Sequence, residues 1–462
     1  MKIRKFTIYI VSLLIINVPL NSPIHALLTP KEELEIGERF LKSINLEYEI
    51  ADYPYIVNYI NELGHYIGSF VEVPYFPLNF YIIQDNDINA FAAPAGHVFF
   101  FSGIISMMEN VDELASVLAH ELGHVSARHL AARIERSKKI GLATMAGILA
   151  GVLIGGDAAG ALMTGSMAAG IQAELGYSRE DERQADQLGY KYTNMAGFNP
   201  EGMITTLKKI QSEGWHREGS VPSYLLTHPG AAERMTNIEV MLKEYSDKPE
   251  LGKAKKFRSQ FPIFHTMVVA LCNDKEHSKR RFKKILLDDD KSAVAHYGMG
   301  LILERSGFPE EAISHFKIAL EQKPESIPII YSIAKSYQDM GKYDESIASL
   351  QKALDLSPKD KAVLKLFALS LQKLELYDRA AVIFNRLTYL APVEDSIYYH
   401  LGVVYGRQDK LKLAHYNLGI YFTRLKQKEK ARFHFKKAQR LTEGDQVLQE
   451  KIDSALNELD NQ

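Results

Sequence analysis

The residues that most directly suggest chemistry in this sequence are His120-Glu121-Leu122-Gly123-His124. His120 and His124 are four residues apart, so an α-helix would place both imidazoles on one face, where they can bind one zinc ion. Glu121 would be turned by about 100° from His120, which keeps its carboxylate near the metal without making it a ligand. Such a carboxylate can take a proton from water that attacks a peptide carbonyl and pass it to the leaving amine. The segment therefore predicts peptide hydrolysis at a centre with one zinc ion per chain.

The residues after His124 restrict the type of zinc centre. A metzincin has a glycine three residues and a histidine six residues beyond its second ligand, and this sequence has Ala127 and Leu130 at those positions. That class is excluded. We expect His129 to point well round the helix and to lie at the surface. A helix with two hydrogen-bonded histidines and no metal is the alternative.

An acidic helix start farther along the chain offers a third ligand. Ser178 can cap a helix in which Glu182 and Asp186 are four residues apart and share one face. Glu182 would complete a set of two histidines and one glutamate, while Asp186 could orient a zinc histidine by accepting its second ring proton. Spacing alone leaves the choice open, because Glu180 and Asp181 compete and a solvated acidic helix would have the same residues.

These two segments resemble those of the glutamate-zincin peptidases, which include the CAAX prenyl protease and the HtpX heat-shock protease. That family carries His-Glu-x-x-His on one helix and Glu-x-x-x-Asp on a later one, and the resemblance covers roughly residues 29–245. It implies that Glu182 is the third zinc ligand and that Asp186 supports the site. It also implies a role over the cleft for His228, which is followed by Arg234. His228 would either donate to the oxyanion or bind zinc in a resting state. The alternative is a His-Pro turn that is only part of a loop.

The same resemblance implies a substrate-binding strand beside the cleft. The turn-rich link at residues 89–96 and the β-rich run at 98–103 are similar to the family's edge-strand segment. We expect the substrate to lie extended along Val98–Phe101 and to add to the sheet as an extra strand. The expected substrate-binding residues are Asn89, Phe91, Val98, Phe99 and Phe100.

Capping and periodicity indicate the elements that must position these residues. The segment Thr29-Pro30-Lys31-Glu32 predicts the start of a helix, a second helix fits residues 55–70, and Asn110 can cap the helix that carries the histidines. Alternation at 78–83 and the later β-rich run predict a small sheet. We therefore expect residues 27–250 to form an α+β metallopeptidase domain of the zincin type.

A repeat occupies the C-terminal part of the chain. Pro324, Pro358 and Pro392 are evenly spaced, and the step between them, about 34 residues, is the period of tetratricopeptide repeats. Residues 419–438 resume the pattern half a period out of phase, so one helix is expected to serve two units. We expect a polar linker at 251–260 and an all-α tetratricopeptide-repeat solenoid at 261–455.

The N-terminal segment at residues 1–26 has the features of a secretory signal peptide. Three basic residues precede an apolar run at 6–18, and Ala26 stands at a suitable cleavage position. The run is shorter than the roughly 20 apolar residues that span a bilayer. We expect residues 1–26 to be removed on export, with an uncleaved N-terminal anchor as the alternative.

Two uncharged stretches, at 140–156 and 158–173, separate the two metal-binding segments. Each would be about 25 Å long as a helix, which is shorter than the roughly 30 Å hydrocarbon core of a membrane. We expect residues 140–173 to form a hairpin that covers the cleft or makes peripheral contact with a membrane. Close packing of small residues in a protein core is one alternative, and a membrane span is the other, although Asp157 would fall between its halves.

Composition excludes other classes of protein. Of the 462 residues, 46% are hydrophobic and 24% are charged, which is typical of a globular chain. Because 57 acidic residues oppose 55 basic ones, the chain as a whole lacks the cationic field of a nucleic-acid-binding protein. Cys272 is the only cysteine, so no intrachain disulfide can form.

An exported zinc peptidase joined to tetratricopeptide repeats resembles the family of periplasmic peptidases that assist β-barrel assembly. The resemblance implies a location in the periplasm and chaperone-like handling of unfolded or stalled outer-membrane proteins. It also implies docking on the outer-membrane β-barrel assembly machinery. The alternative is a weakly active or inactive peptidase fold that serves as a protein-binding scaffold.

Overall fold

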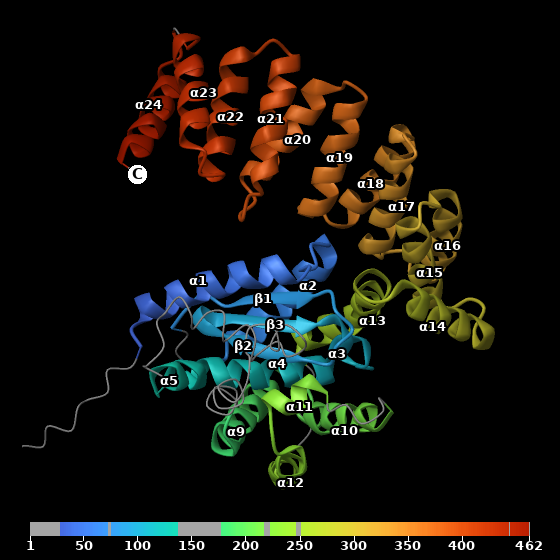
Figure 1. The fold of residues 1–462 in the computed structure, drawn as a ribbon. Helices are drawn as coiled ribbons and strands as arrows, with labels where there is room; N and C mark the ends of the chain where they lie inside the picture. The colour runs from blue at the N-terminus through green and yellow to red at the C-terminus, as the bar shows by residue number, and fades with distance from the viewer. Residues whose placement is uncertain are drawn as a thin grey trace, which may run out of the picture.

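The computed structural model describes residues 28–72, 75–136, 177–216, 222–245, 251–442 and 444–461. Within these ranges the chain is mainly helical, with one three-stranded sheet in the N-terminal region and an array of paired helices in the C-terminal region (Figure 1). The expected fold class, an α+β domain followed by an all-α solenoid, is confirmed.

Two segments discussed above fall outside these ranges. The expected signal peptide at residues 1–26 and the expected hairpin at residues 140–173 both lie outside the described residues. In the part of the chain that is described, no helix has both the length and the hydropathy that a membrane span requires.

The N-terminal region surrounds the sheet with helices. Its elements are α1 (Pro30–Glu47), α2 (Pro54–Gly68), β1 (Asn79–Ile83), β2 (Ala90–Ala93), the 3-10 turn η1 (Pro94–Gly96), β3 (His97–Phe101), α3 (Ser102–Ser106), α4 (Val111–Ser126), α5 (His129–Arg136), α9 (Arg179–Met195), α10 (Glu201–His216), α11 (Ser223–Thr227) and α12 (Ala231–Leu242). Helix α1 begins at the expected capping box, in which the Thr29 side chain accepts from the Glu32 backbone and the Glu32 side chain accepts from the Thr29 backbone.

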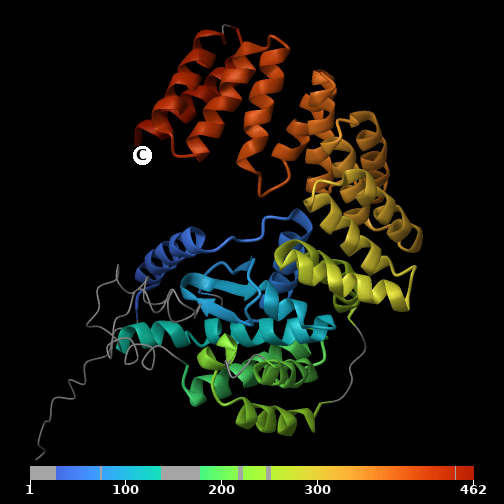
Figure 2. The same cartoon turned by 45° about the vertical axis from the view of Figure 1, so that its right-hand side comes forward.

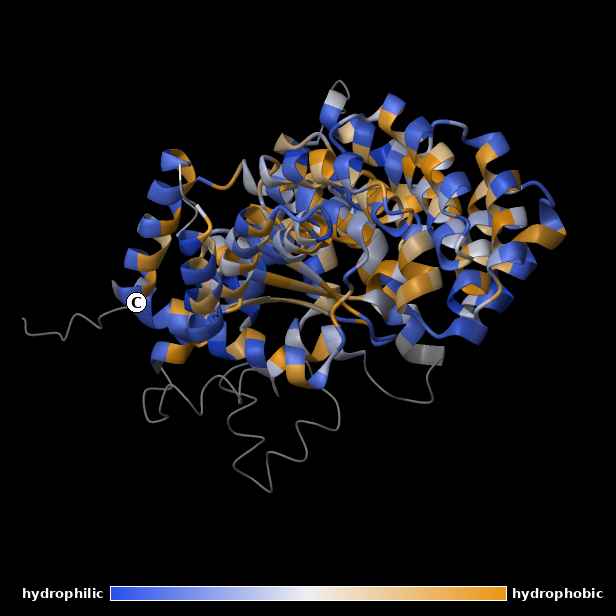
Figure 3. Ribbon diagram, turned by 90° about the horizontal axis from the view of Figure 1, so that it is seen from above, coloured by the Kyte–Doolittle hydropathy of each residue, from blue (hydrophilic) through white to orange (hydrophobic). Residues whose placement is uncertain are grey.

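The strand order of the sheet is β1-β3-β2, so β3 is the central strand. It pairs in parallel with β1 and in antiparallel with β2. The strands are hydrophobic along their length (Figure 3), and the side chains of Val98, Phe99 and Phe100 are fully buried. The prediction that a substrate adds along Val98–Phe101 is therefore wrong, because both edges of this strand are already paired.

Residues 251–260 form part of a helix rather than the expected polar linker. Helix α13 (Gly252–Cys272) begins within this range and packs against the N-terminal region. Tyr59 on α2 stacks on Phe264 with ring centroids 4.1 Å apart, and its hydroxyl donates to the Phe257 carbonyl over 3.0 Å. Arg258 forms an ion pair of 2.7 Å with Asp112 on α4. Helix α13 therefore joins the two regions into one hydrophobic core.

The C-terminal region stacks the paired helices that the repeat period predicts. They are α14 (Lys275–Asp288), α15 (Ala293–Arg305), α16 (Pro309–Gln322), α17 (Ile327–Asp339), α18 (Tyr343–Leu356), α19 (Lys361–Lys373), α20 (Tyr377–Thr388), α21 (Asp395–Arg407), α22 (Leu411–Arg424), α23 (Lys428–Arg440) and α24 (Gln446–Asn461). Figures 1 and 2 show that the array curves as an arc over the side of the N-terminal region that carries α1 and α2.

Small residues let the two helices of a pair approach closely. A side chain at Gly300 on α15 would meet Phe316 on α16 at 2.4 Å. The same relationship recurs at Gly402, which faces Leu418 on α22, and at Gly419 on α22 itself, which faces Phe435 on α23. Helix α22 is therefore the second helix of one pair and the first helix of the next.

Candidate metal centre

Helices α4 and α9 position the predicted metal-binding residues. The Asn110 side chain caps α4 by accepting from the Glu113 backbone over 3.0 Å, and Ser178 caps α9. The two helices cross in close contact because each has a glycine at the crossing. A Cβ atom on Gly123 would lie 2.8 Å from the Ala185 carbonyl oxygen, and one on Gly189 would lie 3.1 Å from the His120 Cα. Without these glycines the two helices could not bring their ligands together.

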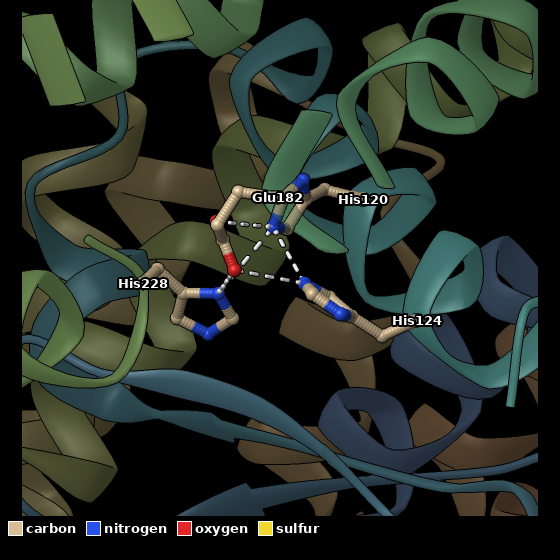
Figure 4. A group of neighbouring side chains, drawn as sticks. All are labelled: His120, His124, Glu182 and His228. Atoms are coloured by element: carbon tan, nitrogen blue, oxygen red, sulfur yellow. Dashed lines mark hydrogen bonds and ion pairs between the residues drawn. The ribbon is translucent and has the colours of Figure 1, made fainter. Parts of the chain in front are cut away.

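Four buried side chains converge between these helices and the segment after α11. His120, His124, Glu182 and His228 each offer one ligand atom, and the four atoms lie within 4.8 Å of one another (Figure 4). His120 Nε2 lies 3.1 Å from His124 Nε2, and His228 Nδ1 lies 3.1 Å from Glu182 Oε1. Three imidazole nitrogens and a carboxylate oxygen directed at one point suit a divalent metal ion.

Asp186 and Arg234 contact His120 and Glu182 and hold these two side chains in position. The Asp186 carboxylate lies 2.9 Å from His120 Nδ1, so it can accept the second ring proton, as the spacing on α9 predicts. Arg234 on α12 donates to both Asp186 oxygens at 2.8 and 2.9 Å and pairs with Glu182 at 2.9 Å. Burial opposes ionisation of Asp186, but the Arg234 charge and the His120 hydrogen bond hold its pKa at about 2.

The acidic residue Asp181, which competes with Glu182 in the sequence, has a different partner. It caps its own helix and forms an ion pair with Arg133 on α5. Burial raises the pKa of Asp181, but the Arg133 and Ser178 hydrogen bonds outweigh it and bring the pKa to about 2. Glu180 points to Arg183 at the surface. Neither carboxylate belongs to the buried cluster.

The prediction for His129 was wrong. Its side chain is only 6% exposed, and its Nδ1 lies 3.0 Å from Nδ1 of His124. Its other nitrogen lies 3.0 Å from the Gln184 side-chain oxygen on α9. His129 therefore holds the ring of His124 from the side opposite the cluster.

Two tyrosines that the sequence did not indicate pack on the imidazoles. Tyr177 stacks on His124 with ring centroids 3.7 Å apart, and the Arg133 guanidinium lies 4.6 Å from the centre of the Tyr177 ring. Tyr224 on α11 stacks on His228 at 4.5 Å. Tyr177 directly precedes the cap of α9, but no spacing rule distinguishes it from an ordinary core aromatic.

Glu121 lies beside the cluster without joining it. It is fully buried, and neither of its carboxylate oxygens has a hydrogen-bond partner among the residues described. Its Oε1 lies 3.6 Å from His228 Nε2. Burial raises the pKa of Glu121, and nearby positive groups partly oppose that rise. A buried carboxylate free of partners is suited to accept a proton from a bound molecule.

The segment from Tyr224 to His228 runs along the outer edge of β2. The Tyr224 backbone N–H donates to the Ile88 carbonyl over 3.0 Å, and His228 Nε2 lies 3.3 Å from the Ala90 carbonyl oxygen. The Phe101 backbone N–H donates to the Asn89 carbonyl. In an antiparallel pair, hydrogen-bonded and non-hydrogen-bonded residue pairs alternate, so the backbone N–H and C=O groups of Ala90 and Ala92 point away from β3.

Asn89 and Phe91, which were also expected to bind substrate, lie near the outer edge of β2. Their side chains are fully buried. Phe91 packs in the core against Phe99, with ring centroids 5.1 Å apart, and Asn89 pairs with the central strand through its carbonyl. On the outer edge of β2, the backbone polar groups of Ala90 and Ala92 face the segment Tyr224–His228 rather than a neighbouring strand.

Comparisons with known proteins agree with this architecture. Residues 57–242 match the model of peptidase family M48, and residues 327–360 and 413–445 match a tetratricopeptide-repeat model. The chain is 30% identical over 234 residues to the beta-barrel assembly-enhancing protease of Escherichia coli (strain K12), covering 48% of each chain. It is 28% identical over 312 residues to the protein of that name from Yersinia pestis, covering 65% of this chain and 62% of the relative.

A third relative matches a shorter part of the chain. The chain is 29% identical over 169 residues to the metalloprotease LoiP of Escherichia coli (strain K12), covering 35% of this chain and 62% of the relative. The chain thus spans about half to three fifths of the length of these relatives. Residues 57–242 therefore form a metallopeptidase domain of family M48, and tetratricopeptide repeats follow it in the same chain.

Proposed function

We propose that the chain is a zinc-dependent endopeptidase in which His120, His124 and Glu182 hold one zinc ion. The observation that carries the proposal is the buried cluster of nitrogen and carboxylate ligands with the unpartnered Glu121 carboxylate beside it. Zinc held by two histidines and a glutamate lowers the pKa of a bound water and polarises a carbonyl.

The remaining steps belong to residues of this chain. Glu121 takes the proton of the attacking water and passes it to the leaving amine, since it lies next to the ligands but contacts no other group strongly. Asp186 keeps His120 in the tautomer that leaves Nε2 free for a metal, and Arg234 keeps Asp186 ionised. His129 fixes the orientation of His124 in the same way.

We infer that the substrate binds as an extended chain on the outer edge of β2. The outward polar groups of Ala90 and Ala92 support this choice, and the edge lies beside the metal ligands. Pairing of this kind requires a stretch of substrate without its own secondary structure. Unfolded proteins are therefore the expected substrates.

His228 blocks the proposed substrate edge in the described conformation. Its Nδ1 faces the other ligands, while its Nε2 faces the Ala90 carbonyl that a substrate would need. This arrangement supports a resting state in which His228 is a fourth zinc ligand and the segment 224–228 occupies the edge of β2. The oxyanion-donor alternative is less well supported, because Nε2 already has an acceptor within the chain.

The biological role that we propose is quality control during the assembly of outer-membrane β-barrel proteins in the periplasm. The names of two relatives and the tetratricopeptide repeats support it. Unfolded or stalled outer-membrane proteins would be the clients, and the β-barrel assembly machinery would be the docking partner. A repeat-based scaffold with little peptidase activity is the competing proposal.

Metal analysis combined with a cleavage assay tests the proposal. We expect purified chain to hold one zinc ion, Glu182→Ala to lose it, and Glu121→Gln to keep it. Glu121→Gln should lose cleavage of an unfolded substrate by a factor of about 100 or more, because the base is removed but the ligands are not. Full cleavage by Glu121→Gln would reject the mechanism. A wild-type chain that holds zinc but cleaves no substrate would favour the scaffold.

A further inference from the structure

A row of aromatic rings crosses three neighbouring helices near the C-terminal end of the array. Ring contacts link Tyr399 on α21, Tyr421 and Phe422 on α22, and His434 and Phe433 on α23, with successive centroids 5.2 to 5.4 Å apart. We call these five residues the aromatic ladder. The side chains at its two ends are well exposed, with 44% of Tyr399 and 55% of Phe433 open to solvent.

Basic side chains lie over the rings of the aromatic ladder. Lys430 lies 5.4 Å above Phe422, and Lys437 lies 6.0 Å from the centre of Phe433. Between residues 411 and 440 the chain has nine lysines and arginines and one acidic residue, Glu429. Among the described residues, no ion pair involves Lys430 or Lys437. These helices are thus strongly basic within a chain of net charge −2.

Helix α18, earlier in the array, lacks this combination. It carries three acidic residues and one lysine, and its only aromatic residue is Tyr343. A helix face that only contacts solvent would have the composition of α18, because exposed aromatic rings add apolar surface and do not increase solubility. A row of neighbouring aromatic rings with unpaired cations above it is instead the surface that attracts an anionic chain with apolar or aromatic side chains.

We propose that the aromatic ladder binds an extended, acidic segment of polypeptide that carries aromatic side chains. Helices in contact are about 8–10 Å apart, so a row across three of them is about 20 Å long, the length of roughly six extended residues. A narrow row suits one extended chain, whereas a membrane surface suits a broad basic patch. The acidic side chains of the peptide pair with Lys430 and Lys437, and its aromatic side chains pack against the exposed rings of the row.

This site is separate from the metal centre, so the proposal does not rest on peptidase activity. His415 on α22 holds His434 in the row, because the Nδ1 atoms of the two rings lie 2.9 Å apart. The two ends of the row lie on different helices, so the site exists only where α21, α22 and α23 are stacked. It would hold one part of a client while another part reaches the metal centre.

Binding of a labelled synthetic peptide tests the proposal. The probe alternates glutamate with tyrosine, and matched peptides have lysine in place of glutamate or serine in place of tyrosine. Fluorescence anisotropy with the full chain bearing Glu121→Gln prevents cleavage from altering the probe. We expect the glutamate–tyrosine peptide to bind best. The double variant Lys430→Glu/Lys437→Glu should weaken its binding about tenfold or more, and Phe433→Ala about fivefold.

The control is a double variant with the same change of charge elsewhere in the array. Lys317→Glu/Lys352→Glu alters exposed lysines on α16 and α18 and should change the affinity less than twofold. Equal weakening by both double variants would overturn the proposal, because it would mean diffuse charge attraction. Absence of peptide binding would also overturn it, as would binding of phosphatidylglycerol vesicles through Lys430 and Lys437 with no binding of the peptide.

Discussion

The Tyr55 hydroxyl on α2 lies 3.4 Å from each carboxylate oxygen of Asp360, which is 305 residues away at the start of α19. The Tyr55 ring also meets Tyr331 on α17 edge to face, with centroids 5.3 Å apart. Burial, followed by the Asp360 charge, holds the pKa of Tyr55 well above its usual value, so the phenol stays a donor. Tyr55 thus links α2 directly to α17 and α19, in addition to the core formed through α13.

We expect Tyr55→Phe to loosen this attachment. The substitution removes the hydroxyl that donates to the partly buried Asp360 carboxylate. Loss of this hydrogen bond should lower the free energy of unfolding by about 1 kcal/mol. Chemical denaturation measures the change, and small-angle X-ray scattering should report a larger radius of gyration. Tyr389→Phe is the matched control, because that side chain is 86% exposed. An unchanged denaturation midpoint in Tyr55→Phe would mean that the contact contributes nothing.

His228→Ala should distinguish the two roles considered for this residue. If His228 closes the resting site, its loss should raise cleavage of unfolded proteins and self-cleavage while zinc content stays the same. If it stabilises the oxyanion, the same change should lower cleavage by about 100-fold or more. We expect the rise. Leu226→Ala, at an exposed position of α11, controls for disturbance of the segment.

His129→Ala should weaken zinc binding about tenfold or more, because His124 loses the group that holds its Nδ1. Competition with a chelator measures the affinity. His129→Asn should retain part of it, since an amide can replace one hydrogen bond, whereas a purely structural defect would not be rescued. His277→Ala, an exposed histidine on α14, should have wild-type affinity. Equal affinities for all three variants would show that His129 has no part in the site.

His265 should make stability depend on pH. Its ring lies 3.2 Å from the Ser106 carbonyl oxygen on α3, and burial, followed by the Arg281 charge, lowers its pKa to about 4. Because the folded-state pKa lies below the unfolded value of 6.5, the unfolded chain binds a proton first as the pH falls. Stability is complete above about pH 6.5 and declines toward pH 4, by at most about 3 kcal/mol for this group.

Urea denaturation at several pH values tests the contribution of His265. The difference in unfolding free energy between the wild type and His265→Gln should shrink as the pH falls from about 7 to about 4. His277→Gln is the control, and its difference from the wild type should stay constant. A constant difference for His265→Gln as well would disprove the assignment.

The pairing of His120 with His124 was predictable because its signal is local, one helical spacing. Spacing left Glu182, Glu180 and Asp181 open as the third candidate, and only the family resemblance selected Glu182. His129 differs from the expectation because the helix of His120 and His124 ends before it. Helix α4 ends at Ser126, and Arg128 then adopts a left-handed conformation with φ of 52°, which turns the next residue back toward His124.

The strand order and the role of α13 depend on contacts between distant residues. Nothing in residues 97–101 indicates that β1 and β2 pair on either side of β3. Lys253, Lys255 and Lys256 make the range expected as a linker polar, although Ala254, Phe257 and Phe261 have helical spacing. That apolar face is buried against α2 and α4, and its periodicity could have identified the helix.

The continuous core through α13 affects how genetic data on this protein should be read. Core residues of the first repeats, such as Phe316, belong to the same hydrophobic cluster as Leu118 on the helix of the metal ligands. Truncating such a side chain removes several kcal/mol of stability, typically about 3–5 for phenylalanine. A screen for lost proteolysis would therefore recover substitutions in the repeats that touch no client. Abundance of the folded protein must be measured before any such position is assigned to a partner.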